Sequence, residues 1–457
     1  MTLVITGAAL ATVDDNGSEY TNGHIVVEGD RIAAIGSGPA PAIPGATIVD
    51  GRGCLVTPGL VNTHHHLYQW ATRGMSQTCT LFEWLVELYP IWGRLDADVT
   101  HAAASGGLAR LALTGCTTVA DHHYVFPAYG GDQAAAVVSA ADRIGTRLHL
   151  VRGSMDRGES GGGLPPDNIV EDTDAALAAT EEAIAKYHDP AGNARVRVAV
   201  GPCSPFSVTE RLMTGAAELA RRVNVRMHTH LAETVDEDEQ CRREFGCTPV
   251  EYAERLGWLG DDVWLAHAVH LTPGAISAIA GSGTGTAHCP TSNARIAVGV
   301  APVADLLAAG VPVGLGVDGA ASNESGGLAE EMHQALLFAR QRSSPTTPPS
   351  RSGPTSLSPR QALWMATAGG ARCLGRADDL GSLEVGKLAD LAMWRLDGLA
   401  HAGIDDPVAA LVLGAPAPLE LLLVGGEPVV RTNQLTTVDD RVLARELVAA
   451  HRKLVDR

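Results

Sequence analysis

The hydrophobic positions of the chain change their spacing twice. Across residues 1–57, short strand-type apolar runs are separated by clusters of Asp, Asn and Gly, a pattern that predicts a meander of antiparallel strands. Strand-type runs return near the other end, at 389–394 and 421–426. We expect the two ends to pair into one small β-sandwich, made of residues 1–57 and 376–457 and ending in a helical tail.

Between these ends, apolar strands alternate with Ala/Leu-rich segments that favour helices, such as Thr173 to Tyr187 and Glu210 to Arg222. The predicted strands end at Asn62, Ala120, Val151, Val200, Thr229, Ala266, His288 and Val317. Strands that alternate with helices are typical of parallel βα units. Eight such units predict an α/β fold, a (β/α)8 TIM barrel over residues 58–375.

The first barrel strand ends in histidines. An apolar run at 54–56 leads through Pro-Gly into Leu60-Val61, and His64, His65 and His66 follow. Because alternate side chains of a strand share a face, His64 and His66 are expected to point the same way. Two neutral imidazoles on one face suit zinc. Taken alone, the pattern also fits a polar strand end with solvated histidines.

Other strand ends add partners for this pair. His230 ends the fifth strand, with Glu233 three residues later, while His267 ends the sixth strand and Asp318 follows the eighth. Active sites of such barrels lie at the C-terminal ends of the strands, so these side chains should converge. Three histidines and one carboxylate fit a mononuclear zinc site with a position left for water. The predicted ligands of one Zn²⁺ per subunit are His64, His66, His230 and Asp318, and Fe²⁺ is an alternative ion.

Each member of the set has an ordinary structural explanation. His230 could be a core histidine, Glu233 belongs to an acidic segment that could be solvated, and Asp318 could cap a helix. His228 shares the face of His230, and we assign it to packing or to the orientation of a ligand. The occurrence of all these groups at strand ends favours a site over separate structural roles.

Hydrolysis at such a site needs proton transfer. A carboxylate within reach must take a proton from water and return one to the substrate. Glu233 and Asp318 are the candidates, and His267 can assist by donating to developing charge or by aligning the attacking group. The predicted catalytic residues are therefore Glu233, His267 and Asp318.

Charge, cysteine spacing and the apolar pattern argue against several other classes of protein. The net charge of −18 disfavours binding to nucleic acid or to an anionic membrane surface. The eight cysteines form no Cys-x-x-Cys pair, which argues against a disulfide scaffold, a zinc ribbon and deaminases that bind zinc through that motif. The N-terminal segment lacks a basic region typical of signal peptides, and no apolar run is long enough for a membrane span. A cytoplasmic enzyme is expected.

At these residues the sequence resembles the amidohydrolase superfamily. The segments that carry the resemblance are Pro58 to His66, His230 to Glu233, Leu265 to His267, Gly316 to Asp318 and, near the C-terminus, Gly386 to Leu391. The resemblance is to the deaminase/chlorohydrolase branch, which uses one metal ion. A carboxylated lysine that bridges two metals has no candidate, since the fourth strand (196–203) contains no lysine.

Within this branch, the segments 64–69, 120–124, 202–209 and 288–293 are similar to those of the 8-oxoguanine deaminases. The resemblance implies hydrolytic deamination at C2 of 8-oxoguanine, which gives urate and ammonia. Isocytosine, which has the same amidine edge, is implied as a second substrate. The partners implied are a small purine-like molecule and further copies of the same chain in a homo-oligomer.

The resemblance also suggests substrate contacts. Gln69 matches the place where guanine deaminases carry a glutamine for the base edge, and an amide can both donate and accept there. Further candidates for substrate contact are His122, His123, Arg152, Cys203 and Ser204. For each of them, a role in ordinary packing is an equal alternative. Pro-Cys-Ser-Pro-Phe at 202–206 departs from guanine deaminases and weakens the hypothesis of a guanine deaminase. A triazine hydrolase and an inactive metal-binding scaffold are the competing hypotheses.

Overall fold

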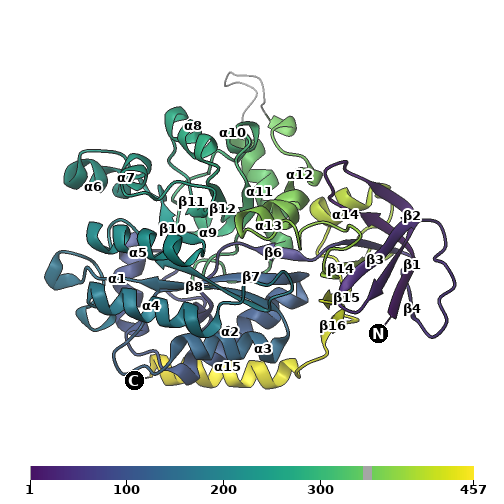
Figure 1. The fold of residues 1–457 in the computed structure, drawn as a ribbon, viewed down its shortest axis with the longest axis horizontal. Coiled ribbons are helices and arrows are strands. Elements are labelled where there is room, and N and C mark those ends of the chain that lie inside the picture. The colour runs from purple at the N-terminus through teal and green to yellow at the C-terminus, as the bar shows by residue number, and fades with distance from the viewer. Residues whose placement is uncertain (1, 343–352, 457) are drawn as a thin grey trace.

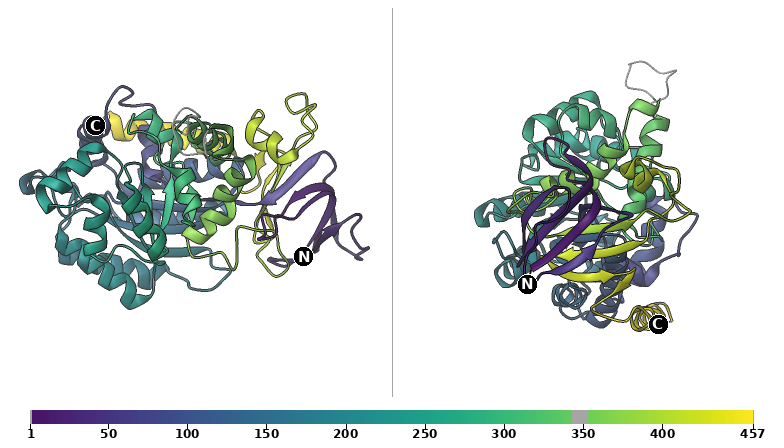
Figure 2. Two further views of the ribbon diagram at one scale, coloured as in Figure 1. Left: turned by 90° about the horizontal axis from the view of Figure 1, so that it is seen from above. Right: turned by 90° about the vertical axis from the view of Figure 1, so that its right-hand side faces the viewer.

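The computed structural model describes residues 2–342 and 353–456. It contains a closed barrel of parallel strands surrounded by helices and, beside the barrel, a sheet built from both ends of the chain (Figure 1). In the left view of Figure 2 the sheet projects from one side of the barrel, and in the right view it faces the viewer in front of the barrel. The predicted TIM barrel with an appended β-structure from both termini is thereby confirmed.

All eight predicted barrel strands are formed. They are β6 (Leu60–Asn62), β7 (Cys116–His123), β8 (Arg147–Ser154), β9 (Val196–Pro202), β10 (Met227–Leu231), β11 (Val263–His267), β12 (Gly285–His288) and β13 (Val313–Leu315). Neighbouring strands pair in parallel, and the pairing of Leu315 with Asn62 joins the last strand to the first. The barrel is closed, so its C-terminal rim brings distant segments together.

Five strands continue beyond their predicted ends, and β7 and β8 do so furthest. β7 runs past Ala120 to His123, and β8 runs past Val151 to Ser154. The apolar pattern stops at Ala120 because Asp121, His122 and His123 are polar, yet all three side chains are buried. A strand can therefore continue through buried polar residues, and the hydrophobic pattern does not reveal this part of the strand.

Helices cover the outside of the barrel. Those between β6 and β13 are α1 (Leu81–Trp92), α2 (Ala97–Leu113), α3 (Gln133–Ile144), α4 (Thr173–Tyr187), α5 (Glu210–Val223), α6 (Val235–Phe245), α7 (Pro249–Arg255), α8 (Pro273–Ser282), α9 (Pro290–Arg295) and α10 (Val303–Ala308). Polar caps start many of them: Asp172 accepts backbone N–H bonds at the start of α4, and Thr209 does so for α5. The barrel is completed by α11 (Leu328–Arg342), α12 (Pro359–Trp364) and α13 (Gly370–Cys373), the last two joined by a π-helical turn.

Within the described residues, the appended sheet has nine strands. From the N-terminus come β1 (Thr2–Ala11), β2 (Glu19–Glu28), β3 (Arg31–Ser37), β4 (Thr47–Asp50) and β5 (Cys54–Pro58), and from the C-terminal part come β14 (Leu391–Arg395), β15 (Leu419–Val424), β16 (Glu427–Arg431) and β17 (Gln434–Leu435). The antiparallel pair β5–β14 joins the two sets. β4 and β5 both lie parallel to β1, so the expectation of a purely antiparallel N-terminal meander was wrong. The long connection from β3 to β4 permits the first parallel pair, and β5 continues along the same edge of β1 after a short break at 51–53.

Two helices complete the chain, α14 (Pro407–Leu413) and α15 (Asp440–Val455). α15 leaves the sheet and runs along the barrel beside α2 (Figure 1). It also contacts η1 (Leu67–Thr72), a 3-10 helix that follows the first barrel strand, where Nδ1 of His451 donates to the carbonyl of Ala71 at 2.8 Å. None of the described helices has both the length and the apolar character needed to cross a bilayer.

Candidate metal-dependent active site

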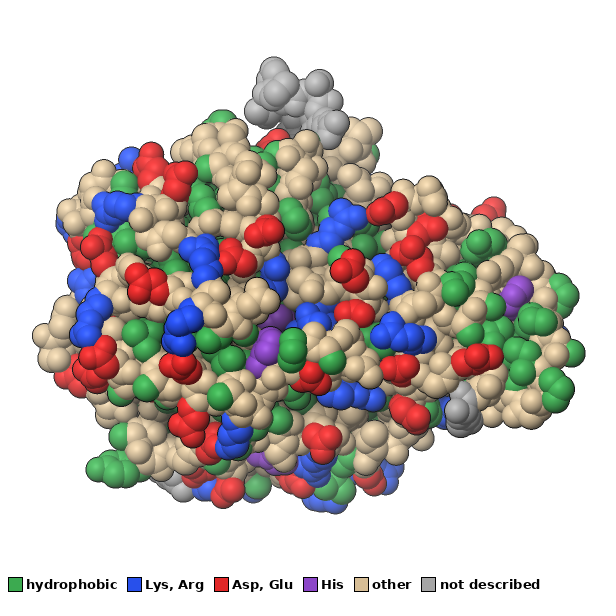
Figure 3. Space-filling model, in the orientation of Figure 1, with side chains coloured by type: hydrophobic (Ala, Val, Ile, Leu, Met, Phe, Trp, Pro, Cys, Tyr) green, Lys and Arg blue, Asp and Glu red, His purple; other side chains and the backbone are tan. Residues whose placement is uncertain are grey.

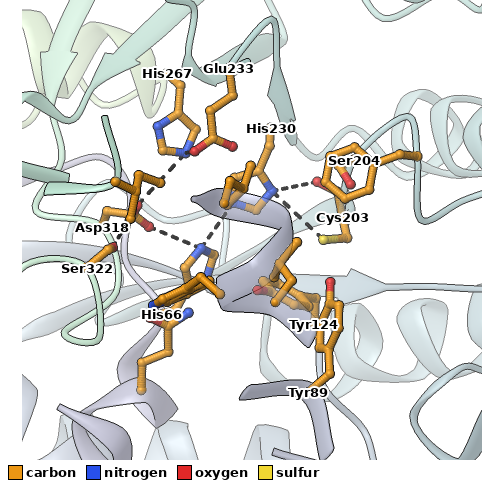
Figure 4. A pocket seen from close by; sticks show the side chains of 16 residues that line it. His66, Tyr89, Tyr124, Cys203, Ser204, His230, Glu233, His267, Asp318 and Ser322 are labelled. Atoms are coloured by element: carbon orange, nitrogen blue, oxygen red, sulfur yellow. Dashed lines mark hydrogen bonds and ion pairs between the residues drawn. The ribbon is translucent and has the colours of Figure 1, made fainter. Parts of the chain in front are cut away.

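A cavity lies at the C-terminal ends of the barrel strands. Its lining combines the histidines and acids predicted from the sequence with aromatic and aliphatic side chains (Figure 4). The residues that line it are His66, Gln69, Leu81, Trp84, Leu85, Tyr89, Tyr124, Cys203, Ser204, Phe206, His230, Glu233, His267, Ile296, Asp318 and Ser322. Catalytic side chains of such barrels collect at this rim.

The four predicted metal ligands lie around one point. Oδ1 of Asp318 is 3.2 Å from Nε2 of His64 and 3.3 Å from Nε2 of His66. Nε2 of His66 is 3.0 Å from Nε2 of His230. The side chains lie on β10 or just beyond β6 and β13, and they are almost completely buried. The structure thus brings together side chains that the sequence places in three distant segments.

Hydrogen bonds fix which nitrogen of His64 carries the proton. Nδ1 of His228 lies 2.8 Å from the carbonyl of Trp264, and because a carbonyl can only accept, this nitrogen donates. In a neutral ring the other nitrogen, Nε2, is then an acceptor, and it lies 2.8 Å from Nδ1 of His64. Nδ1 of His64 must therefore donate to it, which leaves Nε2 of His64 without a proton. His228 has the orienting position expected for it.

The same reasoning applies to the other two histidines. Nδ1 of His66 donates to the carbonyl of His122 at 2.7 Å, and Nδ1 of His230 donates to the carbonyl of Cys203 at 2.6 Å. Burial lowers the pKa of His64 and of His230 well below the ordinary value, which keeps both rings neutral. All three Nε2 atoms therefore present lone pairs to one another and to a carboxylate oxygen.

This donor set fits a divalent cation. Lone pairs that face each other at these distances repel unless a positive charge lies among them, and Nε2 of His64 has no hydrogen-bond partner within the described chain. Three imidazole nitrogens and one carboxylate oxygen, each ring held through Nδ1, are typical of a catalytic zinc site. The ligand types do not distinguish zinc from iron.

Asp318 is held through its second oxygen. Oγ of Ser292 donates to Oδ2 at 2.6 Å, and Oγ of Ser322 lies 3.3 Å from the same atom. Burial alone would raise the pKa of Asp318, but the neighbouring imidazoles of His64 and His66 hold that pKa well below its ordinary value. Its backbone adopts a left-handed conformation with φ of 60°, which is costly for a residue with a side chain. The oxygen Oδ1 is left to face the histidines.

Glu233 and His267 lie beside this cluster. Oε1 of Glu233 is 3.6 Å from Nε2 of His267, which in turn is 4.0 Å from Oδ2 of Asp318. Nδ1 of His267 lies 2.9 Å from Oδ1 of Asn293, to which it donates, so Nε2 faces the two carboxyl groups. Burial, with a smaller contribution from the nearby charge of Asp318, raises the pKa of Glu233 to about 8. Glu233 is buried, so the explanation of a solvated acidic segment does not hold for it.

The predicted substrate contacts divide into two groups. Gln69, Cys203 and Ser204 line the cavity, and both amide atoms of Gln69 are buried without a hydrogen-bond partner within the described chain. The remaining three, His122, His123 and Arg152, do not line it.

Their side chains are engaged elsewhere. Arg152 forms two 2.7 Å hydrogen bonds to Glu171 and lies over the ring of Phe126. Nε2 of His123 donates to the carbonyl of Val125 at 3.0 Å, and the ring of His122 stacks on that of His230. None of these three side chains lines the cavity, and their contact with a substrate stays a prediction. Arg152 and His123 are held by local partners at their strand ends, whereas His122 lies within the histidine cluster, stacked on His230.

Sequence reasoning did not single out Tyr89 and Phe206 as parts of the cavity wall. Tyr89 comes from α1, which precedes α2 outside the regular strand–helix alternation, and Phe206 lies in the loop after β9. For Phe206, the signal that could have found it is its place in a loop after a barrel strand, where site residues of such barrels collect.

The outer surface is mixed in charge. On the face shown in Figure 3, acidic and basic side chains are interspersed. Many of them form exposed ion pairs, such as Arg242 with Asp238 at 2.6 Å and Arg222 with Glu181 at 2.8 Å. Such pairs contribute little to stability.

A closed parallel barrel with this ligand set beside a buried acid defines a metal-dependent hydrolase. The model of the amidohydrolase family matches residues 55–429. The chain belongs to the amidohydrolase family.

Its relatives include several aminohydrolases. The chain is 45% identical to the 8-oxoguanine deaminase of Pseudomonas aeruginosa over 91% of each chain. It is 37% identical to an isoxanthopterin deaminase from an unknown prokaryote, over 99% of this chain and 97% of that one. Among solved structures, the atrazine chlorohydrolase of Arthrobacter aurescens complexed with zinc superimposes with a TM-score of 0.92 at 34% identity, covering 98% of this chain and all (100%) of that one.

Proposed function

We propose that the protein is a metal-dependent aminohydrolase that converts 8-oxoguanine and water into urate and ammonia, with isocytosine as a second substrate. The observation that carries the hydrolytic part is the convergence of three unprotonated imidazole nitrogens and Oδ1 of Asp318 beside Glu233. The similarity to a bacterial 8-oxoguanine deaminase supports the choice of substrate.

The proposed ligands are His64, His66, His230 and Asp318, and zinc is the ion we propose, with iron as the alternative. When bound, such an ion lowers the pKa of a coordinated water towards ~7. Around it, the protein's own groups handle the protons. Nε2 of His267 and Oδ2 of Asp318 lie 4.0 Å apart and face the same space, where they can accept the proton of the attacking water.

Glu233 is the proposed proton donor. A pKa of about 8 keeps this carboxyl protonated at neutral pH, so it can protonate the ring nitrogen next to C2 as water adds to that carbon. The addition makes C2 tetrahedral. The proton taken from water then passes to the amino group, ammonia leaves, and the proton of the added hydroxyl group returns to Glu233 as C2 becomes a carbonyl carbon. Asp318, held at low pKa, is ionised when water attacks, so the two acids divide the roles of donor and acceptor.

Gln69 is the proposed contact for the base edge. Its amide offers one donor group and one acceptor, and neither atom has a partner within the described chain. An oxopurine edge presents adjacent donors and acceptors that match such an amide. The aromatic walls formed by Trp84, Tyr89, Tyr124 and Phe206 suit a flat ring.

A triazine hydrolase is a second candidate, favoured by the 0.92 TM-score to the atrazine chlorohydrolase. Amine or ammonia release from 8-oxoguanine, isocytosine, guanine and hydroxyatrazine, measured with the purified zinc-loaded protein, separates the candidates. We expect turnover of 8-oxoguanine and isocytosine. Turnover of the triazine alone would remove the proposed function, and bound metal without turnover of any compound would favour an inactive scaffold.

A further inference from the structure

The chain changes direction sharply between the metal ligand His230 and the proposed proton donor Glu233. Ala232 adopts a left-handed conformation with φ of 54°, which turns the backbone out of β10. As a result, two successive backbone N–H groups point the same way. The N–H of Ala232 donates to Oε1 of Glu237 at 2.9 Å, and the N–H of Glu233 donates to Oε2 of the same side chain at 2.8 Å.

Within its acidic segment, Glu237 shares its burial only with Glu233. Its neighbours Asp236 and Glu239 are not buried, whereas Glu237 is buried and lies in the first turn of α6. Its own N–H donates to Oγ1 of Thr234, the residue that caps this helix, at 3.1 Å. A buried carboxylate is costly unless its oxygens accept hydrogen bonds, and here each oxygen accepts one from the turn.

The opposite side of the turn is also held. The carbonyl of Ala232 accepts from the N–H groups of Val269 and His270, each at 2.9 Å. These residues follow His267, so the turn that carries Glu233 is tied to the loop that carries His267. Glu237 holds the N–H side of the turn, and the second loop holds the carbonyl side.

The carboxyl group of Glu233 depends on this backbone for its direction. Within the described chain its closest charged partner is Nε2 of His267, at 3.6 Å, and none of the hydrogen bonds involves its side-chain oxygens. A side chain without hydrogen bonds of its own is aimed by the peptide planes that flank its Cα atom. One of those planes, the peptide that joins Ala232 to Glu233, is held by Glu237 through its N–H group and by the loop after His267 through its carbonyl group.

We propose that Glu237 is a positioning residue that aims the carboxyl group of Glu233 at the reacting ring nitrogen. This inference rests on the proposed role of Glu233. Loss of one acceptor from Glu237 frees the turn to rotate, and misplacement of a reacting group by about 1 Å costs ~10²-fold in rate. Metal and substrate binding should be spared, since no metal ligand and no substrate contact is altered.

The test compares Glu237→Gln with Glu239→Gln, a position on the same helix that is not buried. We expect Glu237→Gln to lower kcat by at least ~10-fold with KM and metal content unchanged, and Glu239→Gln to match the wild type. A fall in metal content, a rise of KM alone, or an unchanged kcat would overturn the proposal. If Glu237→Gln does not fold, Glu237→Asp, which keeps both acceptor oxygens on a shorter side chain, is expected to show the same loss of kcat.

A double-mutant comparison separates positioning from a general structural effect. In the Glu233→Gln background, Glu237→Gln should cause no further loss of kcat, because the group that it aims is already disabled. Losses that multiply in the double variant would overturn the proposal.

Crystal structures of the zinc-loaded variants give an answer independent of substrate. The Glu237→Gln structure should show the carboxyl group of Glu233 displaced and His64, His66, His230 and Asp318 unmoved; an undisplaced Glu233 would overturn the proposal. Absence of turnover in the wild type would refute the proposed function and leave this structural comparison to decide the role of Glu237.

Discussion

Oδ1 of Asp318 lies 3.2 Å from Nε2 of His64, although the two residues follow the last and the first strands of the barrel. The reason is barrel closure: Leu315 on β13 pairs with Asn62 on β6, and each ligand lies just beyond its strand. The contact is therefore a property of the closed barrel and not of either segment alone.

Replacement of a metal ligand should remove metal and activity together. His64→Ala deletes one of four converging donors, and we expect the purified variant to lose bound zinc, measured by elemental analysis, along with turnover. His24→Ala, which changes a histidine of the appended sheet, is the control and should retain both. A His64→Ala variant with a full complement of zinc would contradict ligation by this residue.

His228 should affect the metal more weakly, since it acts through His64. Removal of its ring in His228→Ala leaves Nδ1 of His64 without its 2.8 Å partner. Loss of such an orienting group lowers metal affinity by ~10- to 100-fold. Competition with a chelator measures this change, and wild-type affinity in the variant would show that the contact does not orient the ligand.

Glu233→Gln should separate metal binding from catalysis. The amide keeps the shape of the side chain but cannot donate an acidic proton, so turnover is expected to fall by ~10² or more while zinc content stays normal. Steady-state kinetics with 8-oxoguanine, alongside metal analysis, provide the measurement. A rate near that of the wild type would rule out the assigned proton transfer.

Gly319 provides the space that Gln69 occupies. A Cβ atom at position 319 would meet the side-chain oxygen of Gln69, so Gly319→Ala must displace that amide. Loss of one or two hydrogen bonds to the base, at ~1 kcal/mol each, should raise KM about 10-fold with zinc content unchanged. Gly281→Ala, where a Cβ meets nothing within 4 Å, is the matched control. An unchanged KM in Gly319→Ala would argue against substrate contact by Gln69.

Glu331 should make stability depend on pH. Burial raises the pKa of this fully buried carboxyl from 4.5 to about 7. The folded protein then binds a proton that the unfolded chain releases, so the free energy of unfolding falls as pH rises from about 4.5 to about 7, by about 3 kcal/mol.

Glu331→Gln removes this ionisation and provides the test. Urea unfolding measures the free energy of unfolding of the wild type and the variant across this pH range. As pH rises, this free energy should fall in the wild type relative to the variant. A difference that stays constant with pH would refute the raised pKa.

The sequence predicted the barrel and the residues at its rim because both follow from short-range patterns. Apolar strands alternating with helices predict parallel units, and polar residues directly after such strands must meet at one edge. Asp318 and His230 could be paired on this basis despite their separation, since closure of the barrel is implied by the number of strands.

The direction of individual side chains could not be predicted in the same way. Arg152 lies at a strand end as expected, but Glu171, on the loop that follows, binds it away from the cavity. Glu237 lies in an acidic run, and composition alone predicts that such a run is solvated. The turn at Ala232 nevertheless places two N–H groups against the Glu237 side chain. The order of strands in the appended sheet likewise depends on long connections, which local spacing does not specify.

Closure of the barrel by its first and last strands has a consequence for biosynthesis. His64 and His66 emerge from the ribosome early, but Asp318 is made much later, and η1 gains its contact with α15 only when the final helix has been translated. The nascent polypeptide therefore cannot assemble the full set of ligands until most of it has been synthesised. Metal insertion is thus expected to be a late event in maturation, coupled to the completion of folding and not to its beginning.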